Sequence, residues 1–479
     1  MKKIGIFVGS EQKGFLIALA YQFEKLHGFK VTIFARDKYV VILANRILPN
    51  DNTINIVDCS KLVVQIDSGS FFKKAERIEN MYKIKLSMLL SDDRALGQGY
   101  LSNVQKVPDI KRASWTHNRK IGKLVGDFLQ KENILNGLNI IVQVYPNKII
   151  TTICKKYNMH SFSFSQIKFG DRMFWSDDDY LTGNSYIRRL KKYLLDDEKK
   201  PALEYCIDEA GNKFNKSAEY SYKIATKSAI EIIINDSKKL IRGNNKKDSY
   251  HYLGWLPSVF RRVSNYNYVR SNSTVPDELS SYHIVFFTLH LEPEVALQYF
   301  SPEFSNSMEA IIWISKSLPV NYILVVKEQV ASYGVRSRWY YEQLIKIPNV
   351  VLSHPDVNSW DWIKASNLVA TITGTVGQEA IHFNKPVLSF GKHQIINYLP
   401  TVYYVSNFIE TNEAIEDILY NPKDKEVYQK SKNAFSNAQV DSSIDMPKYK
   451  DTYRSSELEN TMASEAIENL LSEYSEVFN

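Results

Sequence analysis

A turn rich in glycine and hydroxyl side chains is the part of this sequence best suited to bind a phosphate. It follows an apolar run at residues 368–372 and precedes a short helical pattern, and its members are Thr373, Gly374, Thr375 and Gly377. Glycine allows a sharp turn and a close approach to a ligand, and the first amides of a following helix have no internal partner. Glu379, on that helix, can accept hydrogen bonds from ribose hydroxyls. The turn therefore predicts a nucleotide site, with glycines that only pack a strand against a helix as the alternative.

Two aspartates, each followed by an arginine, are the candidate catalytic carboxylates. Asp93 precedes Arg94, and Asp171 precedes Arg172. A neighbouring guanidinium keeps a carboxylate ionised and oriented, as a base or nucleophile requires. We assign the two arginines to the acceptor side of the site. The alternative is that both pairs are ordinary surface ion pairs.

Charged side chains also follow two strands predicted at residues 283–287 and 322–326. His290 and Glu294 come after the first strand, and Lys327 ends the second. His290 is a catalytic candidate, Glu294 an acceptor-side candidate or a helix cap, and Lys327 can neutralise a leaving phosphate or be a solvated lysine. Because a lysine and a helix terminus can carry the charge, we expect no metal and no cofactor beyond a nucleotide-sugar donor.

The elements that must position these residues alternate between strand and helix. Residues 3–8 and 30–34 have strand patterns around a helical pattern at 11–27, and the same alternation returns from residue 283 onward. This order predicts parallel sheets, which bind ligands at the carboxyl ends of their strands. The fold class is therefore α/β, with two Rossmann-like doubly wound domains.

Length and composition shifts set the predicted domains. A chain of 479 residues exceeds what one core usually supports. We predict an N-terminal acceptor-side domain at 1–270 with a helical insertion around 180–262, and a nucleotide-sugar-binding domain at 280–440. The polar stretch 261–277 is the expected linker, and the acidic tail 441–479 is expected to end in a helix that packs back on the first domain.

Charge and hydropathy exclude several classes of protein. No apolar run reaches eighteen residues, three scattered cysteines favour a reducing cytoplasm, and no nucleic-acid-binding pattern occurs. The net charge is +7, and residues 181–275 hold 18 Lys or Arg against 10 Asp or Glu. We expect a cytoplasmic protein, in which this basic region is either a solvated surface or a peripheral contact with anionic membrane lipids.

Several motifs resemble a known family. Residues 287–294 (Phe-Thr-Leu-His-Leu-Glu-Pro-Glu), 325–328 (Val-Val-Lys-Glu), 371–380 and 384–391, with weaker matches at 91–94 and 169–175, are similar to the capsule and surface-polysaccharide biosynthesis family, which includes Kdo transferases. The resemblance implies the GT-B architecture, two domains facing a cleft, with Glu328 beside the donor. Many relatives have Lys-Glu-His-Pro where this chain has Gln329 and Val330, and His354 is the residue that can supply a comparable group.

The resemblance implies a glycosyltransferase. Its donor would be a CMP-activated acidic sugar, Kdo or a nonulosonic acid, and its acceptor a bacterial surface or capsular glycan or glycolipid. Two alternatives stay open: a UDP-sugar transferase or epimerase of the same architecture, and a non-catalytic scaffold for glycan assembly.

Overall fold

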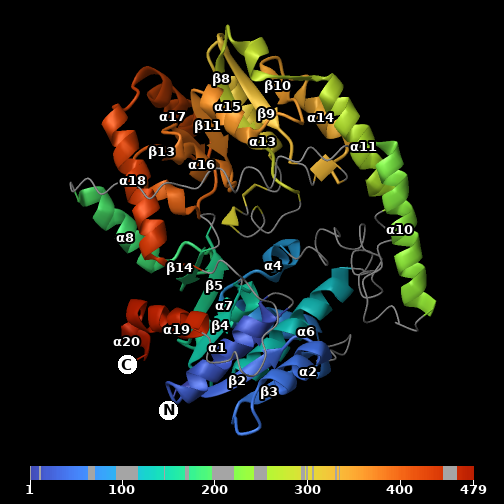
Figure 1. The fold of residues 1–479 in the computed structure, drawn as a ribbon, viewed down its shortest axis with the longest axis vertical. Helices are drawn as coiled ribbons and strands as arrows, with labels where there is room; N and C mark the ends of the chain where they lie inside the picture. Colours follow the sequence, from blue (N-terminus) through green and yellow to red (C-terminus); the bar gives the residue numbers. More distant parts are fainter. Residues whose placement is uncertain are drawn as a thin grey trace. The chain divides into compact units, whose positions relative to one another are not determined.

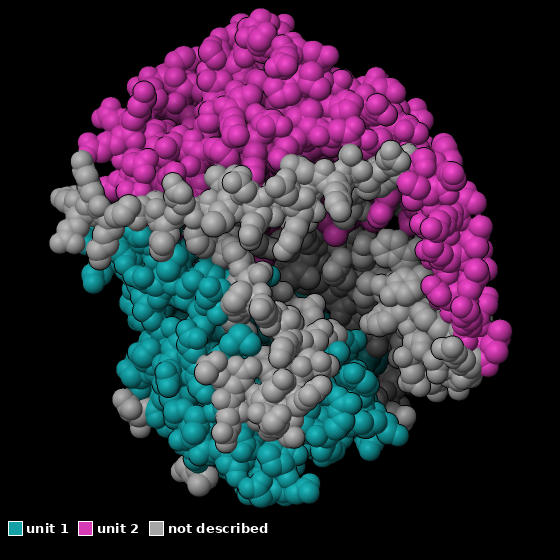
Figure 2. All heavy atoms as spheres, in the orientation of Figure 1, with its two compact units in different colours: residues 1–89, 121–196, 436–479 teal, residues 90–120, 197–435 magenta. Residues whose placement is uncertain are grey.

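The chain forms two compact units in a computed structural model. The structure describes residues 2–9, 12–62, 71–92, 117–144, 146–167, 172–196, 221–241, 256–292, 297, 300–301, 303–304, 307–329, 332–333, 335–445 and 461–478. Unit 1 comprises Met1–Leu89, Ile121–Asp196 and Ser436–Asn479, and unit 2 comprises Leu90–Lys120 and Asp197–Phe435 (Figure 2). The helices α10 and α11 thus belong to unit 2, and the C-terminal segment belongs to unit 1.

Unit 1 is built on a seven-stranded sheet in the order β14-β6-β5-β4-β1-β2-β3 (Figure 1). Its strands are β1 Lys3–Val8, β2 Lys30–Ala35, β3 Asn55–Asp58, β4 Ile140–Gln143, β5 His160–Gln166, β6 Arg172–Ser176 and β14 Ser443–Asp445. The first five are parallel, whereas β6 runs antiparallel to β5 and β14 antiparallel to β6. Its helices are α1 Lys13–Lys25, α2 Lys38–Ile47, α3 Phe71–Tyr82, α6 His117–Leu135, α7 Lys148–Lys156, α8 Asn184–Leu195, α19 Thr461–Glu473 and α20 Ser475–Phe478.

The helix α19 completes the core of unit 1. It lies beside α1 (Figure 1), and its buried Ala466, Ile467 and Leu470 join the apolar cluster of the sheet. Trp175 on β6 donates its indole N–H to the carbonyl of Ala466 at 2.7 Å. A buried indole N–H needs such a partner, so this contact fixes the helix as well as the ring.

Unit 2 contains a second seven-stranded sheet, in the order β13-β12-β11-β8-β9-β10-β7. Its strands are β7 Ser273–Thr274, β8 His283–Thr288, β9 Tyr322–Lys327, β10 Val350–Ser353, β11 Leu368–Thr371, β12 Val387–Ser389 and β13 Val402–Tyr404. All neighbouring pairs are parallel. Its helices are α10 Tyr222–Ile241, α11 Leu256–Ser271, α13 Met308–Ser317, α14 Arg338–Leu344, α15 Ser359–Ala365, α16 Val376–His382 and α17 Phe408–Tyr420, and α18 Lys425–Asp441 runs from unit 2 into unit 1.

The two sheets confirm the α/β class with two Rossmann-like units. The central strands of unit 2 are buried on both faces, as in β11, where all four residues are buried, because helices cover each side of a parallel sheet. No helix in the described ranges is long and apolar enough to cross a bilayer.

One local prediction was wrong. Most of the stretch 261–277, expected to be a linker, is the helix α11, whose buried Val263, Tyr266 and Val269 recur at helical spacing among polar residues. The helix α3 ends at Tyr82, and the next residue, Lys83, has a left-handed φ of 54°. Residues 172–175 belong to the strand β6, in which Met173, Phe174 and Trp175 are buried.

Candidate functional site

Four adjacent strands of unit 2 bring most of the predicted donor-side residues to one edge. The strands β11, β8, β9 and β10 are neighbours and parallel, so their carboxyl ends share that edge. The turn 373–375 follows β11, His290 follows β8, Lys327 ends β9 and His354 follows β10. Ligands of open parallel sheets bind at such an edge.

The turn after β11 is held directly by the loop after β8. The amide of Thr373 donates to Nε2 of His290 at 3.1 Å, and the amide of Gly374 donates to Oγ1 of Thr371 at 2.8 Å. A Cβ on Gly374 would lie 2.8 Å from that hydroxyl and 3.4 Å from the imidazole. Two amides that we expected to face a phosphate therefore bind within the protein, and glycine is required because the turn is pressed against its neighbours.

His290 is a neutral, buried ring. Burial lowers the pKa of His290 to about 3, and the positive charge of Arg336 acts in the same direction. Because Nε2 accepts from Thr373, the proton of the neutral ring belongs on Nδ1. This tautomer makes His290 a hydrogen-bond donor at neutral pH rather than a general base.

Two polar atoms at this junction are buried without a partner. They are Nδ1 of His290 and Oγ1 of Thr373, neither of which has a hydrogen-bond partner in the described part of the chain. Buried polar groups are nearly always satisfied, so unmade bonds of this kind mark a place where a ligand or water can bind. Both atoms can donate to an oxygen.

Lys327 brings a cation to the same edge. Its Nζ donates to the carbonyl of Pro355 at 3.3 Å, and the next residue, Asp356, donates its amide to Nδ1 of His354. Burial lowers the pKa of Lys327 to about 8, against the opposing effect of Asp356. Lys327 therefore contacts the loop that carries His354. A partly desolvated ammonium attracts an anion more strongly than a solvated one.

Glu379 is fixed by a residue that the sequence did not indicate. Trp360, on α15, donates its indole N–H to Oε2 of Glu379 at 2.9 Å, and the hydroxyl of Thr375 donates to Oε1 at 3.3 Å. Burial raises the pKa of Glu379, while these two hydrogen bonds lower it. The carboxylate thus has a set orientation, and its remaining lone pairs can accept from a ribose. Trp360 is the second residue of α15, and nothing in its sequence surroundings pointed to this role.

Glu328 is turned away from the strand ends into a buried ion cluster. Arg336 donates to Glu328 at 2.6 Å and to Glu292 at 2.6 Å, and its third donor binds the carbonyl of His290. The hydroxyl of Tyr341 donates to Glu328 at 2.7 Å. Arg336 was missed because a lone arginine in a loop carries no periodic pattern. This cluster holds the loops after β8 and β9 together.

Gly377 and Gly391 have packing roles. A Cβ on Gly377 would lie 2.7 Å from Ile396, and one on Gly391 would lie 2.3 Å from the backbone oxygen of Ile372. For Gly377 the packing alternative considered from the sequence is thus favoured over direct phosphate contact. The helix α16 that begins here has seven residues, so its dipole contributes little.

The acceptor-side candidates are less well defined. Arg172 uses its guanidinium to bind the C-terminal segment, donating to the hydroxyl and carbonyl of Ser443 at 2.8 Å each and to the carbonyl of Val440 at 3.1 Å. This anchors β14 to β6. Four other candidates lie outside the described residues: Asp93, Arg94, Asp171 and Glu294. Among the residues that the structure describes, no group of three or more His, Cys, Asp or Glu side chains is placed to hold a metal.

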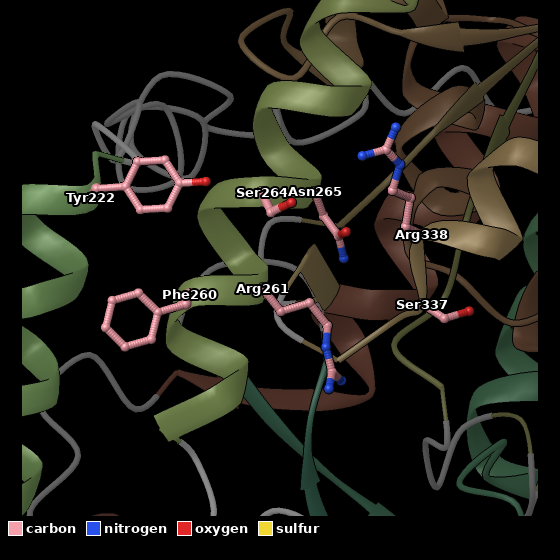
Figure 3. Close-up of a pocket in the computed structure, with 7 residues that line it drawn as sticks. All are labelled: Tyr222, Phe260, Arg261, Ser264, Asn265, Ser337 and Arg338. Atoms are coloured by element: carbon pink, nitrogen blue, oxygen red, sulfur yellow. The ribbon is translucent and has the colours of Figure 1, made fainter.

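A separate pocket of about 590 Å³ lies between α10, α11 and the start of α14. Figure 3 shows its lining, in which the guanidinium groups of Arg261 and Arg338 point away from each other and the rings of Tyr222 and Phe260 lie on the same side. None of the predicted site residues lines it. The candidate site is therefore the strand-end edge and not this pocket.

Comparison with known proteins gives only distant structural likeness. No family model matches the chain, and no curated protein sequence matches it. Among solved structures, it is similar to S. aureus MnaA with UDP (13% identity, 92% of this chain and 94% of that one, TM-score 0.28). It is also similar to the beta Kdo 2,7 transferase of Thermosulfurimonas dismutans KpsC (10% identity, 63% and 80%, TM-score 0.30) and to the spinosyn rhamnosyltransferase SpnG with thymidine diphosphate (10% identity, 92% and 96%, TM-score 0.27). TM-scores this low carry no argument about the site, which is therefore interpreted from its own geometry.

Proposed function

We propose that this protein is a glycosyltransferase that uses a nucleotide-activated sugar and a glycan or glycolipid acceptor. The observation that supports this most is the junction of His290, Thr373 and Lys327. Two buried donors without described partners and one ammonium with a lowered pKa share one edge of a parallel sheet. Such a set suits the oxygens of a nucleotide phosphate.

The chemistry assigned to this edge is stabilisation of the leaving group. The acceptor hydroxyl oxygen bonds to the anomeric carbon, the bond from that carbon to the donor phosphate breaks, and its electron pair leaves with the nucleotide. Lys327 and the N–H of His290 stabilise the charge that forms, and Glu379, oriented by Trp360, holds the ribose. The proton of the acceptor goes to a carboxylate, for which Asp93 and Asp171 remain our candidates. In this scheme Lys327 takes the place of a metal.

For the donor we propose a CMP-activated acidic sugar, Kdo or a nonulosonic acid, on the resemblance of the sequence motifs and the basic composition of residues 181–275. The acceptor would be a surface or capsular glycan, modified in the cytoplasm or at the inner face of its membrane. An anionic donor and a basic protein surface attract each other, which favours encounter.

Calorimetric titration of CMP, UDP and GDP, with and without magnesium, tests this function. We expect CMP to bind best and without magnesium, and Lys327→Met to weaken binding about tenfold or more. Lys316→Met, at an exposed position on α13, is the matched control and should change nothing. A preference for UDP would redirect the assignment to a UDP-sugar transferase or epimerase. If no nucleotide binds, the chain is a scaffold and the proposal is wrong.

Turnover then tests the carboxylates. Release of CMP from CMP-Kdo or a CMP-nonulosonate should fall by about a hundredfold or more in either Asp93→Asn or Asp171→Asn, since a catalytic base contributes that much. Full rates in both variants would exclude both aspartates.

A further inference from the structure

The helix α10 presents an unusual surface to solvent. One side packs against α11 through the buried Ala225 and Ala229, and α11 packs on α14. Figures 1 and 2 show α10 at the surface of unit 2, extending away from its sheet. Most of the other described side chains of this twenty-residue helix are exposed.

A stripe that flanks the packed side is rich in isoleucine. Four isoleucines on it are strongly exposed: Ile230 by 51%, Ile233 by 46%, Ile234 by 45% and Ile241 by 84%. With 3.6 residues per turn they fall within an arc of about 100°. Single exposed apolar residues are common, but four together on one helical face mark a surface that binds a partner.

Lysines border this face. Lys223, Lys227 and Lys238 are all exposed. With 3.6 residues per turn, Lys227 and Lys238 lie just beyond Ile234, on the edge of the arc away from Ala225 and Ala229, while Lys223 lies within the arc. Glu231 is the one exposed acidic residue of the helix. Lysine can lay its apolar stem along a hydrophobic surface while its ammonium reaches an anionic headgroup. An exposed apolar face with a lysine border is the pattern of a helix that lies in the interface of a membrane containing anionic lipids.

Aromatic side chains extend the apolar face at the N-terminal end of the helix. Tyr222 is 57% exposed, and Phe260, from α11, is 41% exposed. Their rings lie near each other in Figure 3, at the pocket between the two helices. Aromatic rings, and tyrosine in particular, are favoured at the headgroup level of membranes.

We propose that α10 is a membrane-docking helix, whose isoleucine face inserts into the interface of a bilayer rich in anionic lipid. The lysine border selects this occupant over a second protein surface, because it complements lipid phosphates. The proposal does not depend on the enzymatic function above, although a glycolipid acceptor would be held at the same bilayer.

Co-sedimentation of the full chain with lipid vesicles tests the docking helix. We expect binding to vesicles of phosphatidylcholine with phosphatidylglycerol, weakened by salt, and little binding to phosphatidylcholine alone. The triple variant Ile230→Gln, Ile233→Gln and Ile234→Gln should lower the partition coefficient roughly tenfold or more. Glutamine is chosen because its helix propensity is high.

Two further variants make the result specific. Lys223→Gln with Lys227→Gln and Lys238→Gln should remove most of the salt dependence. Ile224→Gln is the matched control, since Ile224 is 46% exposed on the same helix but outside the arc, and it should bind as the wild type does. Calorimetric nucleotide binding by every variant separates loss of docking from loss of fold or of the proposed function.

Three outcomes would overturn the proposal. They are no vesicle binding by the wild type, binding unchanged in the triple isoleucine variant, and equal binding to neutral and anionic vesicles. Sedimentation velocity tests one alternative role of this face. If neither protein binds vesicles, and the wild type self-associates whereas the isoleucine variant does not, the face joins two copies of this chain.

Discussion

The amide of Thr373 and Nε2 of His290 are joined by a hydrogen bond of 3.1 Å, which ties the turn after β11 to the loop after β8. Arg336 holds the other side of the same loop by donating to the carbonyl of His290. The turn and loop that form the proposed phosphate site are thus fixed to each other before any ligand arrives, which is the condition for electrostatic preorganisation.

This bond predicts a pH dependence of stability that originates at His290. Below pH 6.5 the unfolded chain binds a proton at His290 that the folded chain excludes down to about pH 3. Stability should therefore be fully present above pH 6.5 and fall as the pH drops through this window, by up to about 1.4 kcal/mol per unit. In His290→Gln, which can still accept from Thr373, urea unfolding should show a correspondingly smaller loss between pH 7 and 4. Parallel curves for the two proteins would exclude this role.

Lys327 predicts a pH dependence of ligand binding. Its pKa of about 8 means that the free protein loses this charge above that pH. The affinity for nucleotide, measured by calorimetry, should decline about tenfold between pH 7 and 9.5. Lys327→Arg should bind with no such decline because a guanidinium stays charged. An equal decline in that variant would assign the effect to another group.

The buried cluster around Arg336 predicts a large loss of stability. Arg336→Met leaves the carboxylates of Glu328 and Glu292 buried without their cation, and should lower the free energy of unfolding by about 3–5 kcal/mol. Arg338→Met is the control two residues away, where an exposed pair with Glu342 is worth about 0.5 kcal/mol. Guanidinium chloride unfolding of both variants gives the comparison, and similar values for the two would contradict it.

Replacing each of two glycines with alanine should change the stability of the protein in opposite directions. A Cβ at Gly391 would meet a backbone oxygen at 2.3 Å, so Gly391→Ala should destabilise the protein by about 3 kcal/mol. At Gly122, inside α6, a Cβ meets nothing within 4 Å, and Gly122→Ala should stabilise by up to about 1 kcal/mol. Thermal unfolding measures both, and a tolerated alanine at residue 391 would refute the packing role.

Regular elements with a clear apolar period could be predicted from the sequence. The strand β1 has the bounds that its pattern indicated, and β8 and β9 extend one residue further. The edge strand β14 could not be predicted. It has only three residues, two of them polar, and so short a segment shows no alternation of apolar and polar side chains. Its place depends on Arg172, whose partners lie some 270 positions along the chain.

The part of the candidate site that lies at strand ends could be predicted from the sequence. His290, Lys327, His354 and the turn after β11 do meet at one edge, since parallel strands end together. The inward turn of Glu328 could not be predicted, because it depends on Arg336 in a loop eight residues away. Nor could the role of Trp360, which becomes visible only when α15 and α16 lie side by side.

The packing of α19 in unit 1 also determines which of the two sheets is completed first during protein synthesis. Lys2 donates to the carbonyl of Val477 at 2.8 Å, and the core of the first sheet contains residues that the ribosome adds after all the strands of unit 2. The strands of unit 2, at 273–404, all emerge earlier. Domains fold as units while the chain grows, so the sheet that is begun first is the one completed last. Until then the edge of β6 lacks its partner β14, and the apolar surface of α1 lacks the helix α19. Exposed surfaces of this kind are what chaperones bind.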